Sequence, residues 1–179
     1  ITVSSIIADN GVGALTLVVT GGNIVTLTGA NTFTGGVVLN SGTLSYNSVN
    51  ANAALGAAAN TIRFDGSATL TGTVAGTNAR GIVLANGSIA SFTNAAIAMG
   101  YSGNITGTGG ILVNNTSGTA TTFSGTSTFT GPVQITSGTL ATTTANAAAV
   151  PSAASEGPVL AVDSSTLLQG QKAVAISHN

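Results

Sequence analysis

Four carboxylates are the only acidic side chains of this 179-residue chain, at Asp9, Asp65, Glu156 and Asp163. Two carboxylates about 5 to 9.5 Å apart can hydrolyse a glycosidic bond, and a cluster of carboxylates can bind calcium. Asp65 and Asp163 are 98 residues apart (163 − 65). The chain repeats with nearly this period, so we expect about four stacked strands, or about 19 Å, between them. That distance is too large for a catalytic pair.

Asp65 also has a purely structural interpretation. An Asp-Gly pair after a short apolar strand is typical of a turn, and Arg63, two residues earlier, would share the outward face of that strand. The resulting surface ion pair would be worth about 0 to 1 kcal/mol. A β-helix enzyme that degrades polysaccharides through these two residues is therefore a remote alternative.

The other side chains that could carry chemistry have no partners in the sequence. The one histidine, His178, is the second-last residue, and no Gly-x-Ser-x-Gly motif with a following histidine is present. The chain has no cysteine, which excludes disulfides and thiolate metal sites. We predict that the protein is not an enzyme and that it uses neither a cofactor nor a metal.

The composition indicates a surface that is polar but almost uncharged. Charged residues make up 4% of the chain, the formal net charge is −1 and the mean hydropathy is +0.49. Low net charge favours association, so we expect the partner to be another copy of the chain, in a homopolymer. Three basic residues are too few to neutralise nucleic-acid phosphates, which excludes DNA and RNA as partners. No apolar run of about 18 residues is present, so no transmembrane segment is expected.

A gap-free repeat organises the chain. Thr-Phe-Thr-Gly at residues 32–35 recurs at 128–131, and Ser-Gly-Thr-Leu at 41–44 recurs at 137–140, both at an offset of 96 residues (129 − 33 and 140 − 44). We interpret residues 1–179 as one domain with a first unit at about 15–110 and a second, incomplete unit at 111–179. Glycines and apolar residues repeat and charges do not, which favours stacking over catalysis. The repeat-defining residues are Gly29, Phe33, Gly35, Gly42 and Leu44 in the first copy and Gly125, Phe129, Gly131, Gly138 and Leu140 in the second.

Short strands are expected between glycine-rich and asparagine-rich turns. No segment has apolar residues at helical spacing, whereas apolar pairs two residues apart, both on one strand face, recur every 14 to 29 residues. This pattern predicts an all-β fold, a parallel β-helix (β-solenoid) of about eight irregular coils, with an antiparallel sandwich as the main rival. The pairs are Leu15/Leu17, Val37/Leu39, Ile62/Phe64, Ile82/Leu84, Ile111/Val113, Val133/Ile135, Leu160/Val162 and Val174/Ile176.

The two ends of such a solenoid would be open sheet edges, which invite pairing with another chain unless they are capped. Both ends of the sequence are strand-like. We expect the N-terminal segment to donate a strand, with Ile1, Val3, Ile6 and Ile7 as its candidate residues. Val174 and Ile176 are the candidates for the opposite edge.

Two further surface functions have weaker support. Thr-x-Thr pairs such as Thr26/Thr28 and Thr69/Thr71 could form a hydroxyl row, as in some ice-binding β-helices, but in the sequence they do not recur at one fixed position per coil. The seven aromatic residues could stack on sugars, but most occupy apolar positions of the strand pattern, which favours the core.

Residues 27–44, Leu-Thr-Gly-Ala-Asn-Thr-Phe-Thr-Gly-Gly-Val-Val-Leu-Asn-Ser-Gly-Thr-Leu, closely resemble the autotransporter-associated β-strand repeat of bacterial passenger domains. Residues 50–56, 62–66 and 107–112 match the usual surroundings of that repeat, so the resemblance covers most of the chain. The second copy departs from the pattern at Pro132, which replaces the second glycine, and at residues 149–151. The resemblance implies a right-handed parallel β-helix that is extracellular or displayed on the cell surface of a Gram-negative bacterium.

These observations lead to two hypotheses about function. In the first, the chain is a non-enzymatic structural subunit that self-assembles end to end, or by terminal strand exchange, into a fibre or surface layer. In the second, it is an adhesin or binding fragment of a larger autotransporter passenger, whose loops contact a glycan or protein of a host or cell surface.

Overall fold

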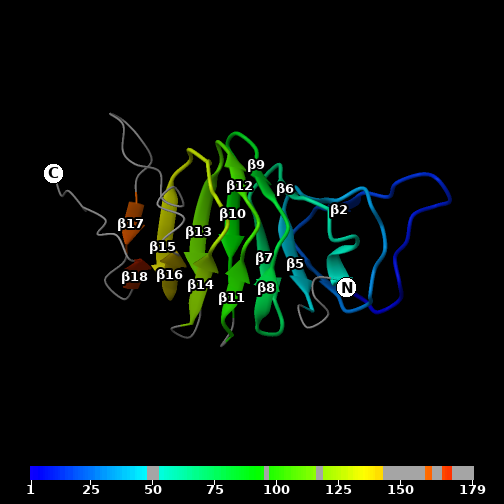
Figure 1. Cartoon of the computed structure of the whole chain (residues 1–179), viewed down its shortest axis with the longest axis horizontal. Helices are drawn as coiled ribbons and strands as arrows, with labels where there is room; N and C mark the ends of the chain where they lie inside the picture. Colours follow the sequence, from blue (N-terminus) through cyan, green and yellow to red (C-terminus); the bar gives the residue numbers. More distant parts are fainter. Residues whose placement is uncertain (48–52, 95–96, 116–118, 143–159, 163–166, 171–179) are drawn as a thin grey trace.

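The computed structural model describes residues 1–47, 53–94, 97–115, 119–142, 160–162 and 167–170. This part of the chain forms a parallel β-solenoid whose coils follow one another along the long axis of the molecule (Figure 1). Apart from the single 3₁₀ turn η1 (Ala53–Leu55), the regular elements described are all strands. No helix within these residues is long and apolar enough to cross a membrane.

Three sheets form the sides of the solenoid. Sheet 1 contains the eight strands β1 (Thr2–Val3), β3 (Ile24–Leu27), β5 (Gly42–Tyr46), β7 (Ala68–Gly72), β10 (Ile89–Phe92), β13 (Gly110–Asn114), β15 (Val133–Ser137) and β17 (Leu160–Val162). Sheet 2 contains the five strands β8 (Gly76–Asn78), β11 (Met99–Tyr101), β14 (Ala120–Phe123), β16 (Thr139–Thr142) and β18 (Leu167–Gly170). Sheet 3 contains the five strands β2 (Leu17–Val19), β4 (Val37–Leu39), β6 (Ile62–Phe64), β9 (Ile82–Leu84) and β12 (Ile105–Gly107).

The chain visits sheets 1, 2 and 3 in turn and then returns to sheet 1 one coil further on, as in β10, β11, β12 and β13. All neighbouring strands described in the three sheets run parallel. The expected parallel β-helix is confirmed, and the antiparallel sandwich is excluded. In the described residues between β1 and β6, the strands alternate between sheets 1 and 3, and none of them belongs to sheet 2.

The solenoid makes about six turns, slightly fewer than the eight expected. The apolar pairs used for the count lie on different sides. Val37/Leu39 belongs to sheet 3 and Ile111/Val113 to sheet 1, so one pair does not correspond to one coil. The first pair is also shifted: β2 begins at Leu17, and its buried residue is Val19. Val174 and Ile176 lie outside the described residues.

The core is built from side chains at a common register. Leu44, Leu70, Phe92, Val113 and Ile135 are successive partners across five strands of sheet 1, and all five are buried. Burial of one such side chain contributes about 1.5 to 3 kcal/mol of transfer free energy. The stacking of like residues therefore supplies much of the stability of the coil stack.

Four of the eight strands of sheet 1 carry hydroxyls at a common register. Thr2, Thr26, Ser45 and Thr71 are successive partners in β1, β3, β5 and β7, and Ser45 is buried. Loops of different lengths between the strands compensate for the uneven spacing in the sequence.

The 96-residue repeat does not return to the same side of the solenoid. Strands β3, β4 and β5 correspond in sequence to β14, β15 and β16, but β3 and β5 lie in sheet 1 whereas β14 and β16 lie in sheet 2. In the same way, β4 lies in sheet 3 and β15 in sheet 1. A central coil takes 22 residues, as from Ala68 to its partner Ala90 (90 − 68). Four coils take 88 residues (4 × 22), so an offset of 96 advances four coils and one further side, rather than four coils alone.

Candidate functional site: the N-terminal edge of the solenoid

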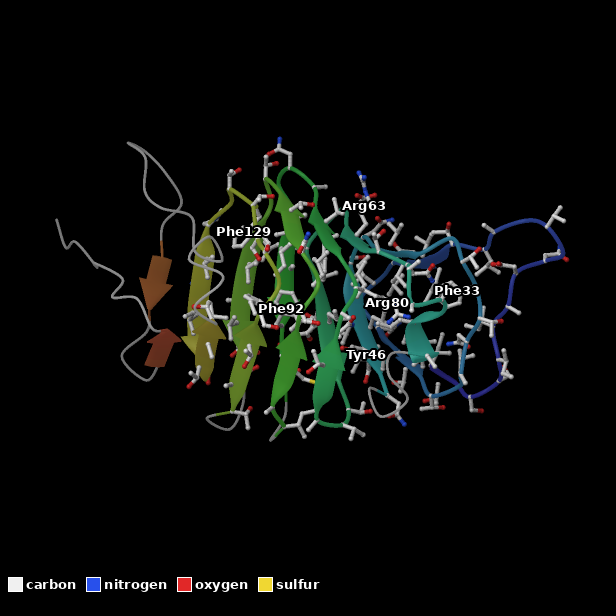
Figure 2. The ribbon with its side chains drawn as sticks, viewed as in Figure 1. Phe33, Tyr46, Arg63, Arg80, Phe92 and Phe129 are labelled. Atoms are coloured by element: carbon white, nitrogen blue, oxygen red, sulfur yellow. The ribbon has the colours of Figure 1, made fainter. Side chains whose placement is uncertain are left out.

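The carboxylates that the structure describes do not form a reaction centre. Arg63 and Asp65 pair through Nε and Oδ1, with side chains 52% and 36% exposed. Figure 2 shows Arg63 at the outer boundary of the molecule. As expected, both charges face outward, because Ile62 and Phe64 of the same strand are buried.

Asp9 has a structural role near the N-terminus. Its Oδ1 accepts hydrogen bonds from the backbone N–H groups of Leu15 (2.9 Å) and Thr34 (2.8 Å), and its Oδ2 accepts one from the Thr34 hydroxyl (2.7 Å). These three donors hold the pKa of the Asp9 carboxyl below its usual value, the Leu15 bond being the largest cause. Within the described residues, no group of three or more His, Cys, Asp or Glu side chains could hold a metal. Glu156, Asp163 and His178 lie outside those residues.

The repeat-defining residues have matching surroundings in the two copies. The phenylalanines and leucines are buried, and a Cβ on four of the glycines would collide with the backbone of the preceding coil. The remaining two glycines have left-handed backbone. The buried residues are Phe33, Phe129, Leu44 and Leu140, the glycines packed on backbone are Gly29, Gly35, Gly125 and Gly131, and the left-handed glycines are Gly42 and Gly138.

Strand β1 is the first strand of sheet 1, and only one of its two sides is paired within the described chain. The terminal ammonium of Ile1 donates to the Ile24 carbonyl (2.7 Å), while the Ile1 and Val3 carbonyls accept from the N–H groups of Thr26 (2.8 Å) and Thr28 (3.1 Å). Consecutive residues of a strand direct their main-chain groups to opposite neighbours, so the N–H and C=O of Thr2 face the open side. Strand β1 is therefore a paired strand of its own sheet whose second side has no partner among the described residues.

Exposed apolar side chains concentrate at this end. Of the seven large apolar side chains exposed in the described part of the chain, five fall within residues 1–24: Ile1, Ile6, Val12, Val18 and Ile24. Val3 and Ile7 instead pack against the core, and the Ile7 N–H donates to Asn31 Oδ1 (2.8 Å). The four candidate donor residues thus divide into two that pack against the core and two that face solvent. The opposite-edge candidates Val174 and Ile176 are not within the described residues.

Three of these five exposed residues were not expected from the sequence. Val18 and Ile24 lie in β2 and β3, whose buried residues are Val19 and Leu27. The apolar-pair pattern placed its first pair at Leu15/Leu17 and contained no pair in β3. Val12 lies in a tight turn in which Asn10 and Gly13 exchange backbone hydrogen bonds. The sequence Gly-Val-Gly at residues 11–13 is typical of a turn. It does not show that this turn exposes an apolar side chain at the N-terminal end of the solenoid.

Comparison with known proteins identifies the repeat. A family model described as passenger-associated-transport-repeat matches residues 17–45 and 116–141, which contain β2 to β5 and β14 to β16 almost completely. A 91-residue segment is 43% identical to the "Adhesin BmaC autotransporter" of Brucella suis biovar 1 (strain 1330). That segment is 50% of this chain and 2% of the adhesin, so the chain corresponds to a small part of its relative.

No solved structure matches the chain. The two matches to the family model are separated by nearly the spacing of the internal repeat and fall on its strand–corner–strand units. The resemblance found in the sequence is thereby confirmed: the chain contains a β-repeat of autotransporter passenger domains, in two copies.

Proposed function

We propose that this chain is a non-enzymatic, passenger-like β-helix subunit that self-assembles end to end into a fibre or surface layer outside a Gram-negative cell. The observation that carries the proposal is the side of β1 that has no partner among the described residues, beside five exposed apolar side chains. The low charge of the chain supports it, because little repulsion opposes the approach of a second copy. The extracellular location is supported by the passenger repeat and by the adhesin relative.

The contact would be a β-augmentation, in which a strand from one copy pairs with the open side of β1 in another. Thr2 would supply the N–H and C=O groups for the new ladder, and Ile1 and Ile6 would be buried beside it. A head-to-tail contact of this kind leaves another free end and propagates. Exchange of β1 between copies is a related route, because this strand has only two residues to hold it in place.

Light scattering and negative-stain microscopy of the full chain test the proposal. Wild-type protein should form particles that lengthen with concentration. Thr2→Pro should prevent this, because it removes the outward N–H and leaves the bonds from Ile1 and Val3 to β3 in place. Ile6→Lys should do the same by placing a charge in the contact. Ile89→Lys is the control, since Ile89 is also exposed but lies in β10 in the middle of sheet 1. A wild-type chain that stays monomeric at high concentration would exclude self-assembly.

Adhesion is the second candidate, and the 43% identity to a protein named as an adhesin favours it. In that case the chain would be part of a larger passenger and would bind a glycan or protein of a host or cell surface. Binding of the monomeric Thr2→Pro variant to cultured cells or to a glycan array would support adhesion independently of assembly. Absence of binding by both wild type and variant would leave assembly as the favoured function.

A further inference from the structure

A cation is enclosed in the solenoid, and none of the carboxylates in the described part of the chain pairs with it. Arg80 follows β8 at a corner, and only 2% of its surface is exposed. Figure 2 shows Arg80 inside the outline of the solenoid, close to Tyr46. One terminal nitrogen, Nη2, donates to the carbonyls of Gly56 (2.6 Å) and Ala57 (3.0 Å), directly after η1. These carbonyls offset only part of a full positive charge.

The described carboxylates are occupied elsewhere. Asp9 accepts its hydrogen bonds from Leu15 and Thr34, and Asp65 pairs with Arg63 on the outer face of sheet 3. Burial lowers the pKa of Arg80, but an arginine guanidinium stays protonated in proteins. A buried charge without a counter-charge is strongly unfavourable, so this position calls for a negative group.

Two further donors of the guanidinium remain unused: Arg80 Nε and Nη1 are buried and have no hydrogen-bond partner. The Tyr46 hydroxyl, near Arg80, accepts a hydrogen bond from Asn78 Nδ2 (3.2 Å) and interacts with the Tyr101 hydroxyl. Burial raises the pKa of Tyr46, and burial with the neighbouring Tyr46 raises that of Tyr101 well above its ordinary value, so both hydroxyls keep their protons at neutral pH.

We propose that the buried guanidinium of Arg80 forms an internal binding site for a small monovalent inorganic anion such as chloride. The guanidinium supplies the charge, and its unpartnered Nε and Nη1 supply the hydrogen-bond donors. Because Arg80 is only 2% exposed, little water screens the attraction between this cation and an anion. A dianion such as phosphate fits this enclosed site poorly, because one cation would compensate only half of its charge.

The test uses the full chain and chloride itself. Urea unfolding is followed in sodium chloride and in sodium gluconate at equal ionic strength. We expect chloride to raise the unfolding midpoint in a saturable manner in wild type and in the control Arg63→Met, whose arginine lies on the surface. In Arg80→Met, where the buried charge is removed, the difference between the two salts should vanish. An equal chloride response in wild type and Arg80→Met would overturn the proposal.

A second measurement does not depend on the stability of a variant. Crystals of wild-type protein grown with bromide in place of chloride should show an anomalous peak within hydrogen-bond distance of Arg80 Nε or Nη1. Broadening of the ³⁵Cl resonance by wild-type protein, reversed by bromide, should accompany it. Water alone at this position, with no chloride-specific broadening, would refute the anion site.

Discussion

Gly42 and Gly138 share the same left-handed backbone, with φ angles of 78° and 86°, although they lie at the start of β5 and just before β16, on different sides of the solenoid. Gly42 begins β5 in sheet 1, and Gly138 directly precedes β16 in sheet 2. The Ser-Gly-Thr-Leu motif therefore specifies a corner and the strand after it, independently of the side on which that corner lies. The unit that repeats is local, and the coil is assembled from such units.

Replacement of these corner glycines by alanine should destabilise the fold more than replacement of a left-handed glycine in open space. Gly87 has φ 76° and would meet nothing within 4 Å, so Gly87→Ala should cost only the left-handed backbone, about 1 to 2 kcal/mol. A Cβ on Gly42 would lie 2.5 Å from the Gly21 carbonyl oxygen, which adds about 1 to 3 kcal/mol of overpacking. Urea unfolding of the two variants measures the difference. Equal losses would show that the contact with the preceding coil has no energetic importance.

The local features of this fold could be predicted from the sequence, whereas the side of the solenoid that each strand occupies could not. Apolar residues at alternate positions and glycine-rich corners were sufficient to predict strands and a parallel solenoid. The side occupied by each strand depends on the summed length of all the loops before it. The Ser-Gly-Thr-Leu motif, which contains Gly42 in its first copy and Gly138 in its second, is the same whatever that summed length is. It therefore cannot predict the side.

The buried polar groups were also beyond prediction from the sequence. Arg80 stands among small polar residues and has the pattern of a surface residue. Its burial depends on the carbonyl of Gly56, which is 24 residues earlier in the sequence. Such contacts between coils leave no periodic signal in a single sequence.

Phe92 is at the centre of an aromatic stack that joins three coils, and its truncation should be among the most damaging core changes. Its ring centroid lies 4.8 Å from that of Tyr101, 5.3 Å from Phe123 and 6.2 Å from Phe64. Phe92→Ala should lower the free energy of unfolding by about 3 to 5 kcal/mol. Phe92→Leu keeps most of the volume and should cost clearly less. Similar losses for both variants, by urea unfolding, would show that ring contacts rather than filled volume matter here.

Asn60 connects η1 to the preceding coil through hydrogen bonds of its side chain. Its Nδ2 donates to the carbonyls of Phe33 (2.9 Å) and Leu55 (3.2 Å), and the residue is buried. Asn60→Ala should cost about 1 to 3 kcal/mol, because buried carbonyls lose a donor. Asn60→Asp should cost more at neutral pH, since it places a negative charge against the same carbonyls. Asn86→Asp in an exposed turn is the control and should be nearly neutral. An equal effect of Asn60→Asp and Asn86→Asp would contradict the assigned role.

Asp9 should make the N-terminal end of the solenoid sensitive to acid. Its pKa is lowered in the folded protein by the bonds from Leu15 and Thr34, whereas in the unfolded chain it should have an ordinary value of about 3.9. A lowered folded pKa means that the contribution to stability is complete above the unfolded pKa. It is lost as the pH falls below about 4 and through the folded pKa. The free energy of unfolding of wild type should therefore decrease on acidification more than that of Asp9→Asn. Thr34→Val removes the hydroxyl donor to Oδ2 but keeps the two backbone donors, so its acid dependence should be intermediate. If wild type and Asp9→Asn lose stability in parallel between pH 7 and 2, protonation of Asp9 does not destabilise the N-terminal end of the solenoid.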